Sequence, residues 1–230
     1  MDWKDVCTVD TVAGRVDFET DIWDDESSCN YSSDGTKLLD AENFPEIVKV
    51  RPGTRIICDG VFAFRDYMAE RRIGEKIPQE ERVSNLEKAF LPEGLTHIGN
   101  EAFLECGWMK GIRLPSSLQY IGSSAFACCW ELRSLACPVS LLAIGDDAFS
   151  NCVSLERVRL NKGLKALGAG AFFGCDSLSE IALPEGLEFI GDDVFGCCEA
   201  LKRIFVPAVA MEKFRALLPP SLHRRLRVSR

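Results

Sequence analysis

The chain has 230 residues, 47% hydrophobic and 27% charged, a globular balance that excludes wholesale disorder. Thirty-five Asp and Glu against 27 Lys and Arg give a net charge of −8, which argues against a duplex nucleic-acid binder. No apolar run approaches the roughly 20 residues that a membrane-spanning helix needs, so no membrane-spanning segment is expected.

Residues 1–44 are predicted to form an acidic N-terminal cap. Residues 1–46 hold 13 Asp and Glu against three Lys and Arg, a net charge of −10. Asp34-Gly35 separates two extended stretches within 31–39, which predicts a hairpin. Four aromatic residues are expected to cover the open edge of the first coil, because solenoids need caps: Trp3, Phe18, Trp23 and Tyr31.

Residues 45–206 are predicted to form a repeat solenoid of six coils. Five units of 23 residues run from Leu91 to about Val206, and the first reads LPEGLTHIGNEAFLECGWMKGIR. Three columns recur with this period: Gly99, Gly122, Gly145, Gly168 and Gly191; Phe103, Phe126, Phe149, Phe172 and Phe195; and Cys106, Cys129, Cys152, Cys175 and Cys198. A sixth, degenerate unit spans 50–64, and an insertion within 65–85 is expected to form a solvated helix-turn, with part of a binding face as the alternative.

The 23-residue period predicts stacked coils, because one unit alone buries too little apolar surface to offset the entropy of ordering its backbone. The L-x-x-I-x-L segment has the alternation of a strand, and L-x-x-I-G predicts a second short strand. The A-F-x-x-C segment places apolar residues three apart, which predicts one helical turn. Each coil is therefore expected to contain short parallel strands and a helical turn.

Residues 207–230 are predicted to form a C-terminal capping helix and a basic tail. Met211, Phe214, Leu217 and Leu218 are spaced as one helix face, and Pro219-Pro220 ends the helix. Six Lys and Arg against one Glu give this segment a net charge of +5.

The repeat L-P-x-x-L-x-x-I-G-x-x-A-F-x-x-C-x-x-L-x-x-I-x-L-P, carried by residues 91–115 with Met109 at one Leu position, resembles the BspA-like leucine-rich repeats. The resemblance covers about 45–206. It implies a right-handed leucine-rich-repeat coil with short parallel strands on one face. It also implies a bacterial cell-surface or secreted protein, often an adhesin or a binder of host proteins.

The location is left open by the sequence. The first 30 residues lack a basic start followed by an apolar run, so no signal peptide is visible in this chain. The protein is expected to be cytoplasmic if Met1 is the true start. It is expected at the cell surface or secreted if a leader was removed.

Eleven cysteines make complete pairing within one chain impossible. The column Cys106 to Cys198 follows the repeat, so its thiols are expected to be small buried hydrophobes. Cys128 and Cys197, which precede column cysteines, are the better candidates for reactive thiols. With two distant histidines and no C-x-x-C, no metal site is predicted.

No catalytic or cofactor-binding residue is predicted, because nucleophile-elbow, phosphate-loop and zinc-protease motifs are absent. The outward positions of the L-x-x-I-x-L strands carry a basic stripe instead. Its members are Arg113, Arg157, Arg159 and Arg203, and these together with Phe205 are the candidate partner-binding residues. Arginine offers paired donors to carboxylates, so the stripe favours an acidic protein patch or an anionic glycan. The alternatives are a solvated solenoid face, or a stripe whose arginines pair with Glu156 and Glu180.

Three functions remain open at this point. The leading hypothesis is a non-enzymatic recognition module that binds a protein or glycan through its strand face. The second is a structural, self-assembling repeat protein, in which the acidic cap and basic tail of two copies attract one another weakly, head to tail. The third and weakest is a thiol-redox protein.

Overall fold

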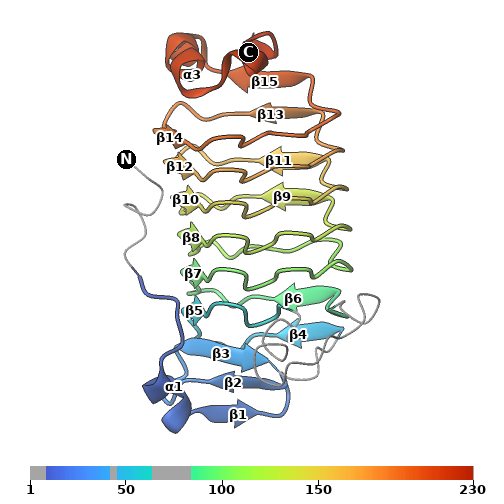
Figure 1. Ribbon diagram of the computed structural model, residues 1–230. Helices are drawn as coiled ribbons and strands as arrows, with labels where there is room; N and C mark the ends of the chain where they lie inside the picture. The colour runs from blue at the N-terminus through green and yellow to red at the C-terminus, as the bar shows by residue number, and fades with distance from the viewer. Residues whose placement is uncertain (1–8, 42–45, 64–83, 230) are drawn as a thin grey trace.

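The computed structural model describes residues 9–41, 46–63 and 84–229, which form an elongated parallel β-solenoid (Figure 1). The fold is the repeat solenoid that the sequence predicts. The insertion expected within 65–85, with its helix-turn, lies outside the described residues except for residues 84 and 85.

One wall of the solenoid is a nine-stranded sheet in the order β1-β2-β3-β5-β7-β8-β10-β12-β14. Its parallel part is built from the L-x-x-I-G segments, as two-residue strands: β5 (Ile56–Ile57), β7 (His97–Ile98), β8 (Tyr120–Ile121), β10 (Ala143–Ile144), β12 (Ala166–Leu167) and β14 (Phe189–Ile190). Each strand pairs in register with its copy one coil away, so that Ile121 lies beside both Ile98 and Ile144. The 23-residue period of the sequence therefore sets the register in which the coils stack.

The opposite wall is built from the L-x-x-I-x-L segments and their equivalents in three shorter parallel sheets, β4-β6, β9-β11 and β13-β15-β16. Its strands are β4 (Ile47–Lys49), β6 (Lys88–Phe90), β9 (Ser134–Ala136), β11 (Arg157–Arg159), β13 (Glu180–Ala182), β15 (Arg203–Val206) and β16 (Leu226–Val228). In β4, β6, β9, β11 and β13 the middle side chain is buried and the outer two are exposed, whereas in β16 Leu226 is buried and Arg227 and Val228 are exposed. This alternation separates core from surface.

The strand expected over 111–113 does not form, and this prediction was wrong for one coil. The backbone at Gly111 and Arg113 follows the solenoid without regular strand geometry. Glycine weakens a strand because it adds entropy to the unfolded chain and has no side chain to pack. Lys110 O still accepts a hydrogen bond from Arg133 N at 3.3 Å, which keeps the neighbouring coils attached.

The core between the walls consists of side-chain columns that repeat from coil to coil. The phenylalanine rings stack nearly parallel, with centres 4.9 Å apart for Phe62–Phe103 and 5.2 Å apart for Phe126–Phe149. Aromatic pairs at this separation contribute beyond their buried area. The column therefore links successive coils through one continuous apolar contact.

The glycine column allows the coils to approach each other at a bend. Gly122 N and Gly145 N each donate a hydrogen bond of 2.8 Å to the Ile carbonyl of the preceding coil. A Cβ on Gly145 would lie 2.7 Å from Gly122 C and from Ser123 N. Only glycine fits at this spacing, because the obstacle is backbone and not a movable side chain.

The prediction of a helical turn at the A-F-x-x-C segment was wrong. The segment is a run of turns in which every fourth residue is left-handed, as at Asp147 (φ 53°) and Asn151 (φ 55°). Asp and Asn tolerate this conformation better than most residues. Phe149 N donates to Ala171 O of the next coil at 2.9 Å, so these backbone groups bond between coils and not within a helix.

The N-terminal end of the solenoid is closed by α1 (Arg15–Glu19), β1 (Ile22–Asp24), β2 (Cys29–Tyr31) and β3 (Lys37–Ala41). β2 and β3 run antiparallel on either side of Asp34-Gly35, and β3 stacks parallel on β5. Among the cap aromatics, Tyr31 is fully buried, whereas Phe18 and Trp23 are over 40% exposed and Trp3 lies outside the described residues. Of the three described cap aromatics, Tyr31 is therefore the one that is buried under the first coil.

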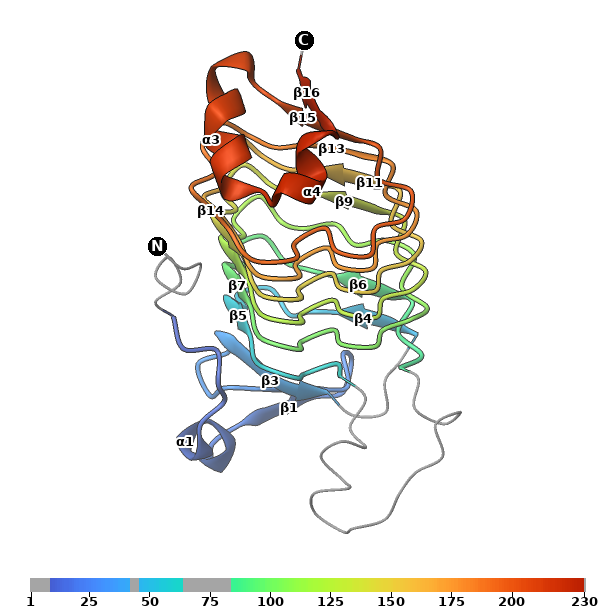
Figure 2. The same ribbon diagram turned by 45° about the horizontal axis from the view of Figure 1, so that its top comes forward.

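The C-terminal end is covered by α3 (Met211–Leu217) and α4 (Pro220–His223) (Figure 2). A 3-10 turn at Ala208–Ala210 precedes them. Phe214 is fully buried, and α3 ends before the proline pair as the sequence predicts. The basic tail holds an unexpected element, because β16 pairs in parallel with β15 and adds a strand to the second wall. None of the described helices is long and apolar enough to cross a bilayer.

Candidate functional site

We define the strand face as the surface formed by the outward side chains of residues 111–113 and of the strands β4, β6, β9, β11, β13, β15 and β16. Two rows run along it, parallel to the solenoid axis. Register pairs Arg157 with Ser134 in the first row and Arg159 with Ala136 in the second. Stacked strands lie about 4.8 Å apart, so each row is a ladder with one side chain per coil.

All five candidate residues lie on this face, and the structure brings them into the two rows. Arg113, Arg157, Arg159 and Arg203 are exposed, and Phe205 is half-buried. Arg113 and Arg159 are separated in the second row by Ala136, whose small side chain leaves the space between them open. Arg159 is separated from Phe205 by Ala182 in the same way.

The charges on the face are only partly neutralised. Arg203 Nη2 lies 2.7 Å from Glu180 Oε2, and Arg203 Cζ lies 5.9 Å from the centre of the Phe205 ring. Both side chains of the Arg203–Glu180 pair are about half exposed, so the pair adds little to stability. Arg113, Arg157 and Arg159 form no ion pair with any residue that the structure describes.

Four further residues of the strand face were missed by the sequence argument. Lys49 and Lys88 lie on β4 and β6, and register places Phe90 beside Lys49. Arg227 lies on β16 beside Phe205. The alternation in Leu226-Arg227-Val228 is the signal that could have revealed this last strand. The described outward positions then hold seven cations and one carboxylate, that of Glu180.

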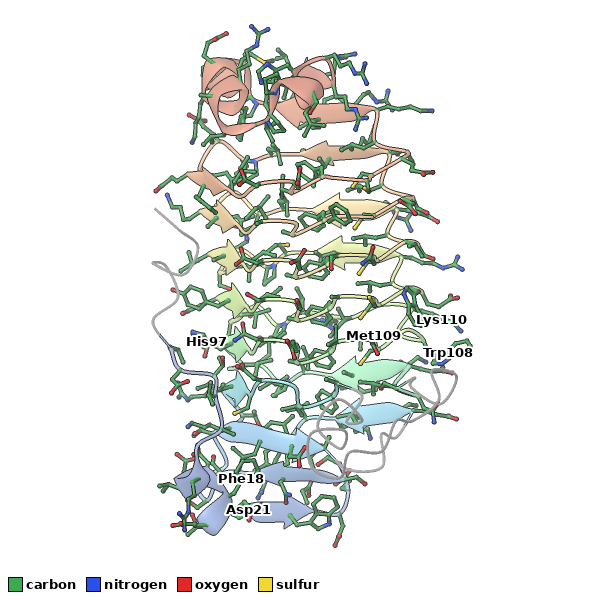
Figure 3. The ribbon with its side chains drawn as sticks, in the orientation of Figure 1. Phe18, Asp21, His97, Trp108, Met109 and Lys110 are labelled. Carbon is green, nitrogen blue, oxygen red and sulfur yellow. The ribbon has the colours of Figure 1, made fainter. Side chains whose placement is uncertain are left out.

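Two exposed tryptophans lie just before the strand face. Trp108 is 51% exposed and Trp130 41% exposed. The Trp130 ring occupies the space that a side chain on Gly107 would need, so it stacks on the backbone of the neighbouring coil. Figure 3 shows Trp108 and Lys110 pointing outward on either side of the buried Met109. Flat aromatic surface therefore borders the cationic rows.

The cysteine column is a structural feature of the core. Cys152 Sγ donates to Phe126 O at 3.2 Å, and Cys198 Sγ donates to Phe172 O at 3.0 Å. Burial raises the pKa of Cys106 and of Cys152 to about 12. These thiols stay protonated near neutral pH, where a redox thiol needs its thiolate form.

The two doublet thiols occupy a surface turn. Cys128 (φ 58°) and Cys197 (φ 54°) take the left-handed position that Asn151 takes in another coil. Cys128 is half-buried, and burial raises its pKa, whereas Cys197 is exposed. Among the described residues, no three His, Cys, Asp or Glu are grouped so as to hold a metal ion.

We expect Cys197 to be the fastest-reacting thiol of a Cys7→Ser protein at pH 8. With a pKa of about 12, less than about 0.1% of Cys106 and Cys152 is ionised at that pH. Reaction of the native protein with a chromogenic disulfide measures the rates. Adding Cys197→Ser should remove the fast phase, and adding Cys152→Ser should leave it unchanged; the reverse pattern would show that the column is accessible.

The comparisons with known proteins assign the repeat. A family model described as "BspA type Leucine rich repeat region" matches residues 80–202 with six copies, more than half of the chain. The chain belongs to the BspA-type leucine-rich-repeat family. Curated proteins gave no match. This repeat family supports a role as an interaction module, and its solenoid fold is typically non-enzymatic.

Solved structures share the solenoid of this BspA-type protein. A leucine-rich-repeat protein of T. pallidum is 23% identical with a TM-score of 0.64, over 87% of this chain and 93% of that one. The pneumococcal vaccine antigen PcpA is 21% identical with a TM-score of 0.63, over 88% and 46%. A leucine-rich-repeat protein of Bacteroides ovatus is 26% identical with a TM-score of 0.56, over 89% and 56%. The chain thus spans less than two thirds of the length of the PcpA chain and of the Bacteroides ovatus chain.

Proposed function

We propose that this BspA-type protein is a non-enzymatic recognition module whose strand face binds an anionic protein or glycan. The observation that carries the proposal is the excess of cations along the two rows, on a chain whose net charge is −8. Arg113, Arg157 and Arg159 have no ion-pair partner within the described part of the chain, and a guanidinium group binds carboxylate or sulfate oxygens with paired donors.

The geometry of the rows supports an extended partner. Side chains recur once per coil along the solenoid axis, so a chain-like polyanion can meet several of them in sequence. The alanines at 136 and 182 leave space between the longer side chains. Phe205, Trp108 and Trp130 add aromatic surface of the kind that strengthens contacts in recognition sites.

The test replaces Arg157 and Arg159 together by Glu and measures binding of heparin oligosaccharide and of a polyglutamate peptide by calorimetry. We expect the affinity for the preferred probe to fall by about a hundredfold or more, because two charge-assisted contacts of about 1.5–3 kcal/mol each are lost. Binding of the native protein should also weaken as salt rises.

The control variant replaces Arg15 and Arg55, two exposed arginines away from the strand face, by Glu. It changes the net charge by the same amount. Equal losses in both variants would show that only net charge matters, and unchanged binding in the Arg157→Glu, Arg159→Glu protein would remove the strand face as the binding surface.

A surface or secreted, adhesin-like location is a further part of the proposal, supported by the resemblance to BspA-like proteins. Its test is to treat intact cells of the source organism with protease and to follow this protein with an antibody. Cleavage with an intracellular marker left intact would support the surface location, and full protection in intact cells would contradict it.

A further inference from the structure

Two strand edges lie at opposite ends of the solenoid. β1 is the terminal strand of the nine-stranded sheet, and β16 is the terminal strand of the sheet β13-β15-β16. β1 lies at the bottom of Figure 1, and β16 lies at the top of Figure 2, beside the C-terminus. The outer edge of a terminal strand presents backbone N–H and C=O groups that another strand can pair with.

Each edge carries apolar surface as well as backbone groups. Ile22 and Trp23 on β1 are both 41% exposed, and Val228 on β16 is 52% exposed. Trp23 donates its indole N–H to Asp25 Oδ1 at 2.7 Å, which holds the ring at the end of the molecule. An exposed tryptophan on a terminal strand is the kind of residue that anchors protein contacts.

The charges at the two edges have opposite sign. Asp21, Asp25 and Glu26 flank β1, with Asp21 half-buried and the other two exposed. Arg224 and Arg227 are exposed beside β16, and the Arg227 guanidinium is held there by hydrogen bonds to Arg224 O and Leu226 O. Charged edges ordinarily prevent strand pairing between copies. Here, like charges oppose pairing of β1 with β1 or of β16 with β16, and opposite charges favour pairing of β1 with β16.

We propose that the partner of these edges is a second copy of the chain, with β1 of one molecule pairing with β16 of the next. Strand addition would supply main-chain hydrogen bonds, and the acidic and basic side chains would select the unlike ends. Because the contact joins two different surfaces, it leaves a free end on each side and generates open, end-to-end assemblies.

The test uses sedimentation velocity of the full chain over about a hundredfold range of concentration, at low and at high salt. We expect the weight-average mass to rise with concentration at low salt and to return to that of the monomer at high salt. A native protein that stays monomeric at low salt and the highest concentration overturns the proposal.

Charge reversal tests the pairing itself. One variant carries Asp21→Lys and Glu26→Lys, and the other carries Arg224→Glu and Arg227→Glu. Each alone should remain monomeric, because the β1 edge of the first variant loses its net negative charge and both edges of the second variant are negative. An equimolar mixture should associate again, because the unchanged basic edge of the first variant meets the unchanged acidic edge of the second. Circular dichroism of each variant shows whether it is folded.

If each variant associates like the native protein, or if the mixture fails to associate while both variants are folded, the edges are not the contact. The variant at the acidic edge separates the two proposals, because Asp21 and Glu26 lie outside the strand face, whereas Arg227 belongs to it. The Asp21→Lys, Glu26→Lys protein should bind heparin or polyglutamate at least as well as the native chain.

Discussion

Replacing Gly145 by Ala is expected to destabilise the protein by about 3 kcal/mol or more, at the upper end of what overpacking usually costs. The added methyl group would lie 2.7 Å from Gly122 C and Ser123 N, closer than real Cβ atoms approach backbone. Relief requires moving two coils apart, which lengthens the 2.8 Å hydrogen bond from Gly145 N to Ile121 O. Urea unfolding followed by circular dichroism measures the loss.

The matched control is Gly111→Ala. A Cβ there would meet nothing within 4 Å, and Gly111 does not have a positive φ. The same chemical change is therefore expected to alter the free energy of unfolding by less than about 1 kcal/mol and to raise it, because alanine restricts the unfolded chain. Equal effects at the two positions would show that the coils at Gly145 are not closely packed.

The sequence determines most of the architecture because the repeat is so regular. Side chains that recur every 23 residues are buried by stacking each one on its copy in the next coil. Phe103 and Phe126, whose ring centres lie 4.9 Å apart, are such a pair. The outward position of Arg157 and Arg159 follows from alternation around the buried Val158. Both conclusions follow from the repeat period and from strand alternation, without knowledge of long-range contacts.

The errors occur where backbone bonding between coils overrides a local pattern. Three-residue spacing at Ala148, Phe149 and Cys152 is compatible with a helical turn, but Phe149 N bonds to Ala171 O in the next coil. The period alone does not say whether a backbone group bonds within its coil or across to the next. β16 was missed for a different reason, because the alternation Leu226-Arg227-Val228 is only three residues long and lies beyond the last repeat, where the period does not place it beside β15.

The candidate face was predicted only in its central part. Arg113 to Phe205 belong to intact repeats and could be aligned by counting, whereas Lys49 lies just before the degenerate unit and Arg227 lies beyond the last repeat. Where the period fails, residues are aligned only by strand pairing, which requires the structure. The extended face nevertheless carries the same charge sign as the predicted part.

Replacing Phe149 by Ala is expected to cost about 3–5 kcal/mol, the usual range for removing a buried phenylalanine. The ring is fully buried, and its centre lies 5.2 Å from that of Phe126 and 5.5 Å from that of Phe172. The substitution therefore breaks the column on both sides at once. Since each coil of a solenoid is stabilised mainly by its neighbours, the urea transition should also broaden as the two halves begin to unfold separately.

Phe90→Ala is the control, since the same ring is removed from a side chain that is 56% exposed on the strand face. We expect a loss below about 1 kcal/mol there. Phe195→Ala gives an intermediate case, because Phe195 contacts one ring of the column, that of Phe172, at 6.0 Å. The order of destabilisation at Phe149, Phe195 and Phe90 thus measures how strongly neighbouring coils are coupled, and equal losses at Phe149 and Phe195 would mean that the column acts as a row of independent residues.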